Sequence, residues 1–192
     1  MFISFENDST SQSIQGISSF LSKEECEIIV DFSLKKIAKE AEIGNAEKNN
    51  KIRKNKVSWL NEHDISLAWL YKKIIQALKE INDNVYKFNI YGLTEEIQFT
   101  QYTEINDHYD WHTDSGPNTN PRKLSIVIQL SDPKDYEGCE LTFLNQTDEF
   151  TKELKKQGSL IIFPSYLAHK VIPLIKGKRY SLVCWVGGPN FK

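Results

Sequence analysis

The densest group of possible metal ligands in this sequence is the stretch DHYDWHTD in its second half. Side chains two positions apart on a β-strand point to the same face. An imidazole from His112 and a carboxylate from Asp114 could therefore reach one point, and His169 in a later strand-like segment could add a third ligand. His108 and Asp110 have the same spacing, so spacing alone leaves two H-x-D pairs open.

Two histidines and one carboxylate on one face of an octahedron are the ligand set of non-haem Fe(II) oxygenases, and they leave coordination positions open for a co-substrate and oxygen. The same ligand types can hold a zinc ion that activates water for hydrolysis. A cupin-like module that binds a ligand without turning it over is a third interpretation. The triad alone does not choose among these classes.

A second feature lies ten residues after His169, in the segment RYSLVCW. On a strand, Arg179 and Ser181 share one face. If that face is buried, the guanidinium needs an anionic partner, because an unpaired buried charge is very costly, and the strand holds no acidic residue. A bound dicarboxylate would serve. The alternative is that Arg179, together with Gln129 on another apolar strand, lies on the solvated face of an edge strand.

The first half of the chain must position these residues, and its pattern is helical. A capping box at Ser22 and Glu25 predicts a helix start, and Gly44 with Asn45 predicts its end. A second helix is expected to begin near 61–64. Its apolar stripe comprises Leu67, Leu70, Tyr71, Ile74, Leu78, Ile81 and Val85.

The second half reads as short strands separated by turn residues. The expected strands are Glu96–Tyr102, Lys123–Leu130, Glu140–Leu144, Ser159–Phe163, Ala168–Ile172 and Arg179–Val186. No helical pattern alternates with them, which disfavours a parallel sheet. We expect an α+β fold with a double-stranded β-helix (a jelly-roll or cupin-like barrel), buttressed by the N-terminal helices. Residues 1–192 would form a single domain, with helical support at about 20–88 and the barrel at about 96–188.

Composition excludes several function classes. The chain has 24 basic and 26 acidic residues, a net charge of −2, whereas a general nucleic-acid binder should carry a basic excess. Three scattered cysteines without a CxxC pair favour a reducing compartment, so the cytoplasm is expected. The sequence contains no apolar run of about 18 residues, so no membrane span is expected. No leader pattern is expected at the N-terminus.

Several spaced motifs, taken in order, resemble the prolyl/lysyl hydroxylase type of Fe(II)/2-oxoglutarate-dependent dioxygenase. These are QFTQY ending at Tyr102, Tyr109-x-x-His112-x-Asp114, His169, and Arg179-x-Ser181. The segments Ile52-Arg53-x-x-Lys56-x-x-Trp59-Leu60 and Arg179–Trp185 more specifically resemble the hypoxia-type prolyl hydroxylases and their bacterial relatives. The resemblance covers most of the chain from about residue 50 onward.

The resemblance also implies roles for individual residues. The family has a tyrosine three residues before its metal-binding histidine, which fits Tyr109 and His112 and selects the second H-x-D pair. The implied metal ligands are His112, Asp114 and His169. The implied 2-oxoglutarate contacts are Arg179, Ser181, Tyr102, Gln129 and Trp185. The residues implied to face the substrate are Tyr109, Arg53, Trp59 and His108.

For function, the resemblance implies Fe(II), 2-oxoglutarate and O₂ as cofactor and co-substrates, with ascorbate helping to maintain Fe(II). The expected reaction is hydroxylation of an unactivated C–H bond of a peptidyl prolyl residue, with release of succinate and CO₂. The partner is then a peptide or protein, with no membrane or nucleic acid involved, and a monomer is expected. A free amino acid or other small molecule is the alternative substrate, and the zinc hydrolase and the non-catalytic module are alternative classes.

Overall fold

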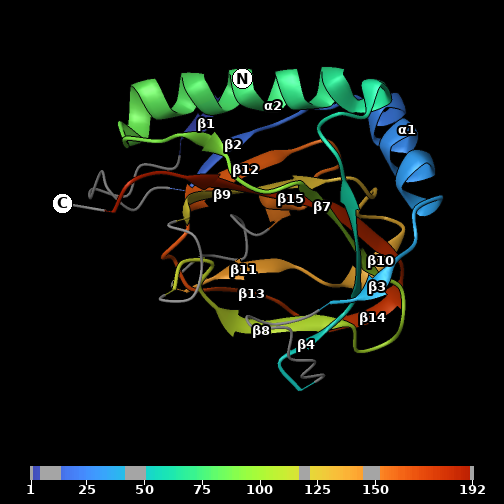
Figure 1. Cartoon of the computed structure of the whole chain (residues 1–192). Helices are drawn as coiled ribbons and strands as arrows, with labels where there is room; N and C mark the ends of the chain where they lie inside the picture. Colours follow the sequence, from blue (N-terminus) through green and yellow to red (C-terminus); the bar gives the residue numbers. More distant parts are fainter. Residues whose placement is uncertain (1, 5–13, 42–50, 117–121, 145–151, 191–192) are drawn as a thin grey trace.

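A computed structural model describes residues 2–4, 14–41, 51–116, 122–144 and 152–190. Two antiparallel sheets face each other, as Figure 1 shows with the large sheet above the small one. The large sheet has nine strands. Their order is β1 (Phe2–Ser4), β2 (Gln15–Ile17), β12 (Leu160–Pro164), β9 (Arg122–Gln129), β15 (Arg179–Gly187), β7 (Ile97–Tyr102), β5 (Lys56–Leu60) and β3 (Lys39–Glu40), with β6 (Gly92–Leu93) beside β15.

The small sheet has four strands and lies opposite the centre of the large one (Figure 1). Its order is β11 (Leu141–Phe143), β13 (His169–Val171), β8 (His108–His112) and β4 (Arg53–Lys54). A separate pair joins β10 (Tyr136–Gly138) to β14 (Leu174–Gly177). Together with the helices, these facing sheets form the predicted α+β fold with a jelly-roll barrel.

The helices cover the outer side of the large sheet. Helix α1 (Lys23–Leu34) begins at the predicted capping box, and α2 (Ala68–Ile81) follows a short 3₁₀ turn, η1 (Ile65–Leu67), and runs into one π-helical turn, η2 (Asn82–Tyr86). Figure 1 shows α2 lying along this sheet. The apolar stripe of α2 packs with outward-facing residues of the central strands in one core. Its members include Leu70, Ile74, Leu78, Phe99, Ile126 and Leu182.

Strand alternation divides the large sheet into a core face and an inner face. On β15, Leu182 and Cys184 belong to the helix-side core, whereas Ser181, Val183 and Trp185 line the space between the sheets. Each central strand therefore supports the fold with every second residue and furnishes the inner space with the others.

The predicted end of the first helix is wrong. Helix α1 stops at Leu34, where the N–H of Lys35 donates to the carbonyls of Phe32 and Ser33. The chain then turns, leaves Ile37 86% exposed, and pairs as β3 with β5. Sheet pairing thus ends the helix before its apolar periodicity does. The expected stop residues Gly44 and Asn45 lie outside the described residues.

In the part of the chain that is described, no helix has the length and apolar character needed to cross a membrane.

Candidate metal centre and cavity

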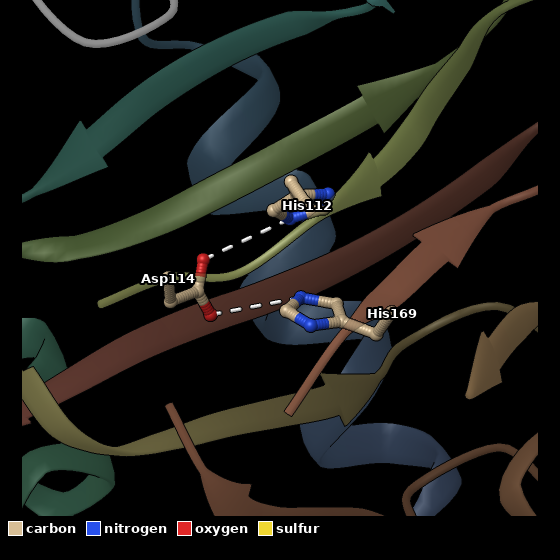
Figure 2. A group of neighbouring side chains, drawn as sticks. All are labelled: His112, Asp114 and His169. Carbon is tan, nitrogen blue, oxygen red and sulfur yellow. Dashed lines mark ion pairs between the residues drawn. The ribbon is translucent and has the colours of Figure 1, made fainter. Parts of the chain in front are cut away.

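His112, Asp114 and His169 converge between the sheets, as Figure 2 shows. One ligand atom from each lies within 4.8 Å of the others. Nε2 of His112 is 3.8 Å from Oδ1 of Asp114, and Nε2 of His169 is 3.6 Å from Oδ2. All three side chains are largely withdrawn from solvent. This spacing leaves room for one cation between two nitrogens and a carboxylate.

Strand pairing brings the two histidines together. His112 ends β8, His169 begins β13, and the two residues are direct partners in the antiparallel register. The strand geometry expected for Asp114 differs, because this residue lies in the loop after β8. Its backbone N–H donates to the carbonyl of Ser165 at 2.9 Å, which turns its carboxylate toward the histidines.

An irregularity in β8 explains the position of Tyr109. His169 pairs with His112 and Val171 with Tyr109, so two steps along β13 match three along β8. One extra residue in β8 forms a bulge and brings Tyr109 to the cavity side with His112. The two rings stack with centroids 3.5 Å apart and an angle of 13° between their planes.

Hydrogen bonds fix which nitrogen of each histidine faces the carboxylate. Nδ1 of His112 is 2.7 Å from the carbonyl oxygen of Asp110, and Nδ1 of His169 is 2.9 Å from that of Leu167. A carbonyl only accepts, so each Nδ1 carries the proton and each Nε2 presents a lone pair. Such outer contacts orient the ligands of protein metal sites.

Asp114 is held in the same way from the other side. Oδ2 accepts a hydrogen bond of 2.6 Å from the hydroxyl of Ser125, which also lies 2.9 Å from the hydroxyl of Ser165. Burial raises the pKa of Asp114, but His169, His112 and the Ser125 bond lower it by more, so the net pKa is below the ordinary value. Burial, helped by His169, lowers the pKa of His112 to about 4. Lone pairs and a negative charge are the donor set that a divalent cation needs.

The triad opens into a cavity of about 670 Å³ that also contains Arg179. Arg179 is 1% exposed, on a strand inside the sheet, so the solvated-edge alternative is excluded. Nε and Nη2 donate to Oε1 of Gln129 at 3.2 Å and 2.8 Å. Nη1 is buried and has no hydrogen-bond partner, and among the described residues no carboxylate pairs with the guanidinium. A buried cation in this state fits an anionic ligand.

The other residues expected at a 2-oxoglutarate site divide into two groups. Tyr102, Ser181 and Trp185 line the cavity. Gln129 is 2% exposed and does not line the cavity in the described structure; it contacts Arg179 instead. The carbonyl end of Gln129 therefore holds the guanidinium in place.

The residues expected to face a substrate also divide. Arg53, Tyr109 and Trp59 line the cavity, and Trp59 is 41% exposed. His108 is not among the lining residues. Its ring nitrogens lie 2.7 Å from the carbonyl oxygen of Asn106 and 3.1 Å from that of Lys51. The structure thus gives His108 backbone contacts rather than a place in the cavity.

Sequence reasoning missed an ion pair at this cavity. Both Nε and Nη2 of Arg122 donate to the carboxylate of Glu95 at 2.6 Å, and the guanidinium lies 3.9 Å from the ring centroid of Trp185. The pair is 27 residues apart and follows no periodic pattern, so no sequence signal pointed to it. Ser125 did carry a signal, because it alternates with Val127 and Gln129 along one strand.

Comparison with known proteins supports the resemblance predicted from the motifs. Residues 97–187 match the family model of the 2OG-Fe(II) oxygenase superfamily. A PKHD-type hydroxylase of Synechococcus sp. (strain CC9902) is 40% identical over 86 residues, which are 44% of this chain and 38% of that protein. One of Nitrosomonas europaea is 29% identical over 137 residues, covering 66% and 57% of the two chains. The chain thus spans less than two thirds of these curated relatives.

Solved structures show the same fold at low sequence identity. A prolyl-4-hydroxylase of Pseudomonas putida aligns with a TM-score of 0.70 and 18% identity, over 92% of this chain and 93% of the other. A prolyl hydroxylase of Trichoplax adhaerens, solved with a hypoxia inducible factor peptide fragment, aligns with a TM-score of 0.74 and 18% identity, over 94% and 85%. The jelly-roll prediction is confirmed by both. The superfamily implies Fe(II), 2-oxoglutarate and O₂, and the triad and Arg179 fit these groups.

Replacing Ser125 tests the support of the carboxylate. Ser125→Ala removes the hydrogen bond to Asp114 but no ligand, and we expect metal affinity to fall about 10- to 100-fold. Isothermal titration of the metal-free protein with Co²⁺ measures the change. Ser159→Ala is the matched control, because the Ser159 hydroxyl is buried without a partner and outside the cavity lining. Equal affinities for wild type and Ser125→Ala would contradict the assignment.

Replacing Gln129 tests the support of the guanidinium. Gln129→Met keeps a similar volume but removes the acceptor of two hydrogen bonds from Arg179. The free energy of unfolding should fall by about 1–3 kcal/mol, because a buried charged donor loses its partner. Urea denaturation followed by circular dichroism measures it. A change within experimental error would mean that Arg179 does not depend on this residue.

Proposed function

We propose that this chain, whose residues 97–187 match the 2OG-Fe(II) oxygenase superfamily, is an Fe(II)- and 2-oxoglutarate-dependent hydroxylase acting on a peptidyl prolyl residue, with release of succinate and CO₂. One observation carries the proposal. Arg179 is buried without a carboxylate partner among the described residues, and it lies in the same cavity as the His112–Asp114–His169 triad. A zinc hydrolase would use the triad but would have no use for the guanidinium. A dicarboxylic co-substrate uses both.

Each residue in this proposal has a limited physical task. The triad would hold Fe(II), and Arg179 with Ser181 would hold the distal carboxylate of 2-oxoglutarate. With 2-oxoglutarate and O₂ bound, the iron supplies the oxidising power that an unactivated C–H bond requires. Tyr102, which is 3% exposed, forms part of the cavity wall beside Arg179. The guanidinium of Arg179 lies 5.3 Å from the centroid of the Tyr102 ring.

Water exclusion is the second contribution of the chain. Val127 and Val183 are adjacent partners on β9 and β15, and both line the cavity. Apolar walls strengthen the contacts between Arg179 and an anionic ligand, because little water competes for the guanidinium. They also limit side reactions of a strong oxidant.

The substrate class rests on the neighbours and on the aromatic side chains of the cavity. Two structural neighbours are prolyl hydroxylases, and one holds a peptide. Here Tyr109, Trp59 and Trp185 line the cavity, and Trp59 is 41% exposed and so accessible to an incoming peptide. Flat aromatic surfaces suit a proline ring.

We further propose that the chain acts as a single catalytic domain and as a monomer. The cytoplasmic location stays a prediction from the cysteine pattern.

Co-substrate turnover tests the chemistry before any prime substrate is known. Protein loaded anaerobically with Fe²⁺ and then exposed to O₂ should convert 2-oxoglutarate to succinate, measured by mass spectrometry. His112→Ala should reduce succinate to the level without protein, because a metal ligand is lost. His63→Ala is the control, since His63 is a surface residue with an 85% exposed side chain. No succinate from the Fe²⁺-loaded wild type, with hydrolysis in the Zn²⁺-loaded protein, would exclude the proposal.

The contribution of Arg179 is separable from that of the metal. Arg179→Ala removes charge-assisted hydrogen bonds to the co-substrate, so the half-saturating 2-oxoglutarate concentration should rise about 10- to 100-fold. Metal affinity, measured by Co²⁺ titration, should stay near the wild-type value. An unchanged 2-oxoglutarate requirement would remove Arg179 from the co-substrate site.

A peptide library analysed by mass spectrometry identifies the prime substrate. Proline-containing peptides should gain 16 Da in the presence of 2-oxoglutarate, and the same peptides with alanine in place of proline should not. Gain of mass only on free amino acids would replace the peptide by a small-molecule substrate while leaving the oxygenase chemistry in place.

A further inference from the structure

Arg53 lines the cavity, and its guanidinium is also held by contacts within the protein. It comes from β4, at the edge of the small sheet, and is only 9% exposed. Its Nε donates to Oδ1 of Asn55 at 2.8 Å, and its Nη2 donates to Oε1 of Gln98 at 2.9 Å. Gln98 belongs to β7 of the large sheet. The guanidinium therefore connects the two sheets through fixed hydrogen bonds.

The same guanidinium lies over the ring of Tyr109. Arg53 and Tyr109 are direct partners in the β4–β8 register, and the guanidinium carbon is 4.5 Å from the ring centroid. A cation over an aromatic face is attracted by the ring quadrupole, more strongly where water is excluded. Two amide oxygens hold the cation, and the cation in turn restrains the Tyr109 ring.

Tyr109 passes this restraint to a metal ligand. Its ring lies 3.5 Å from the imidazole of His112, with 13° between the planes. The bond from Nδ1 to the carbonyl of Asp110 fixes one edge of that imidazole but permits rotation about the bond. A flat ring against the imidazole face removes this rotation and aims Nε2 at the point shared with Asp114 and His169.

We propose that Arg53 is a positioning residue of the metal centre: it clamps Tyr109 onto His112 and so fixes the plane of that ligand. The proposal rests on the metal-binding part of the proposed function and replaces the expectation that Arg53 contacts substrate. In this role the effect of Arg53 on the metal centre passes through Tyr109.

Electrostatics makes this role distinguishable from a simple charge effect. A guanidinium near a divalent cation repels it, so removing the charge alone would tighten metal binding. Loss of a clamp would weaken binding, because the ligand plane is no longer held. The two explanations predict opposite signs. A substrate contact predicts a third result, in which metal affinity is unchanged and only the prime-substrate KM rises.

Titration of metal-free protein with Co²⁺, followed by the visible ligand-field absorption, measures affinity and ligand geometry together. Arg53→Met should weaken binding about 10- to 100-fold, the range for outer contacts of metal ligands, and should change the shape of the absorption band. Arg53→Lys keeps a cation but not the two amide bonds, so it should restore part of the affinity. Lys39→Met is the matched control, because it removes an exposed cation that lines the same cavity.

Variants of Tyr109 test the route. Tyr109→Phe keeps the stacked ring and should bind Co²⁺ within about twofold of wild type, whereas Tyr109→Leu should lose as much affinity as Arg53→Met. The double variant Arg53→Met/Tyr109→Leu should be no weaker than Tyr109→Leu alone, since both remove one coupled interaction. Additive losses would mean that Arg53 acts independently of Tyr109 and would overturn the proposal.

Circular dichroism and urea denaturation of each metal-free variant check that the variant is folded. If Arg53→Met does not fold, Gln98→Leu, which removes one of the acceptors, and Arg53→Lys decide the question. Wild-type affinity in the folded variants would overturn the proposal. Co²⁺ binding needs no turnover, so a wild type that binds Co²⁺ but makes no succinate would refute the hydroxylase and leave the clamp standing.

Discussion

The pairing of β8 with β13, with one extra residue in β8, is the constraint on which the site depends. The pairing sets His112 opposite His169, and the extra residue brings Tyr109 to the same side as His112. A slip of one residue in this register would turn every β8 side chain to the other face. The edge strand β4 on one side and β11 on the other keep this pair inside the small sheet. The two candidate histidine ligands are therefore positioned by main-chain bonds as well as by their side-chain contacts.

The large sheet supplies what the small one lacks. Its central strands place apolar residues against α1 and α2, and this packing forms the larger hydrophobic core. Their alternate residues carry polar groups into the cavity side, among them Ser125 beside Asp114 and Ser181 near Arg179. Because one strand does both tasks, helices α1 and α2 support the site without lining the cavity.

Residue type singled out the candidate metal ligands and Arg179 in the sequence, but it described their geometry incompletely. Period-two alternation suggested that His112 and Asp114 share a strand face, whereas Asp114 lies in a loop turned by Ser165. The spacing from Tyr109 to His112 was meaningful only through family resemblance, because a bulge has no signature in a single sequence. The end of α1 was missed because tertiary pairing of β3 overrides helical periodicity. Long-range contacts such as Arg53 with Gln98 leave no local pattern at all.

The two buried arginines of the cavity, Arg53 and Arg179, differ in how their hydrogen-bond donors are used. Nε and Nη2 of Arg53 donate to two different amide oxygens, so this side chain is part of the framework. Arg179 directs Nε and Nη2 to the single oxygen of Gln129, while Nη1 is left without a partner. One guanidinium is thus satisfied by the fold, and the other has a donor whose burial costs free energy until an anion arrives. That difference in hydrogen bonding, rather than burial or charge, separates Arg53, as part of the framework, from Arg179, the proposed anion-binding residue.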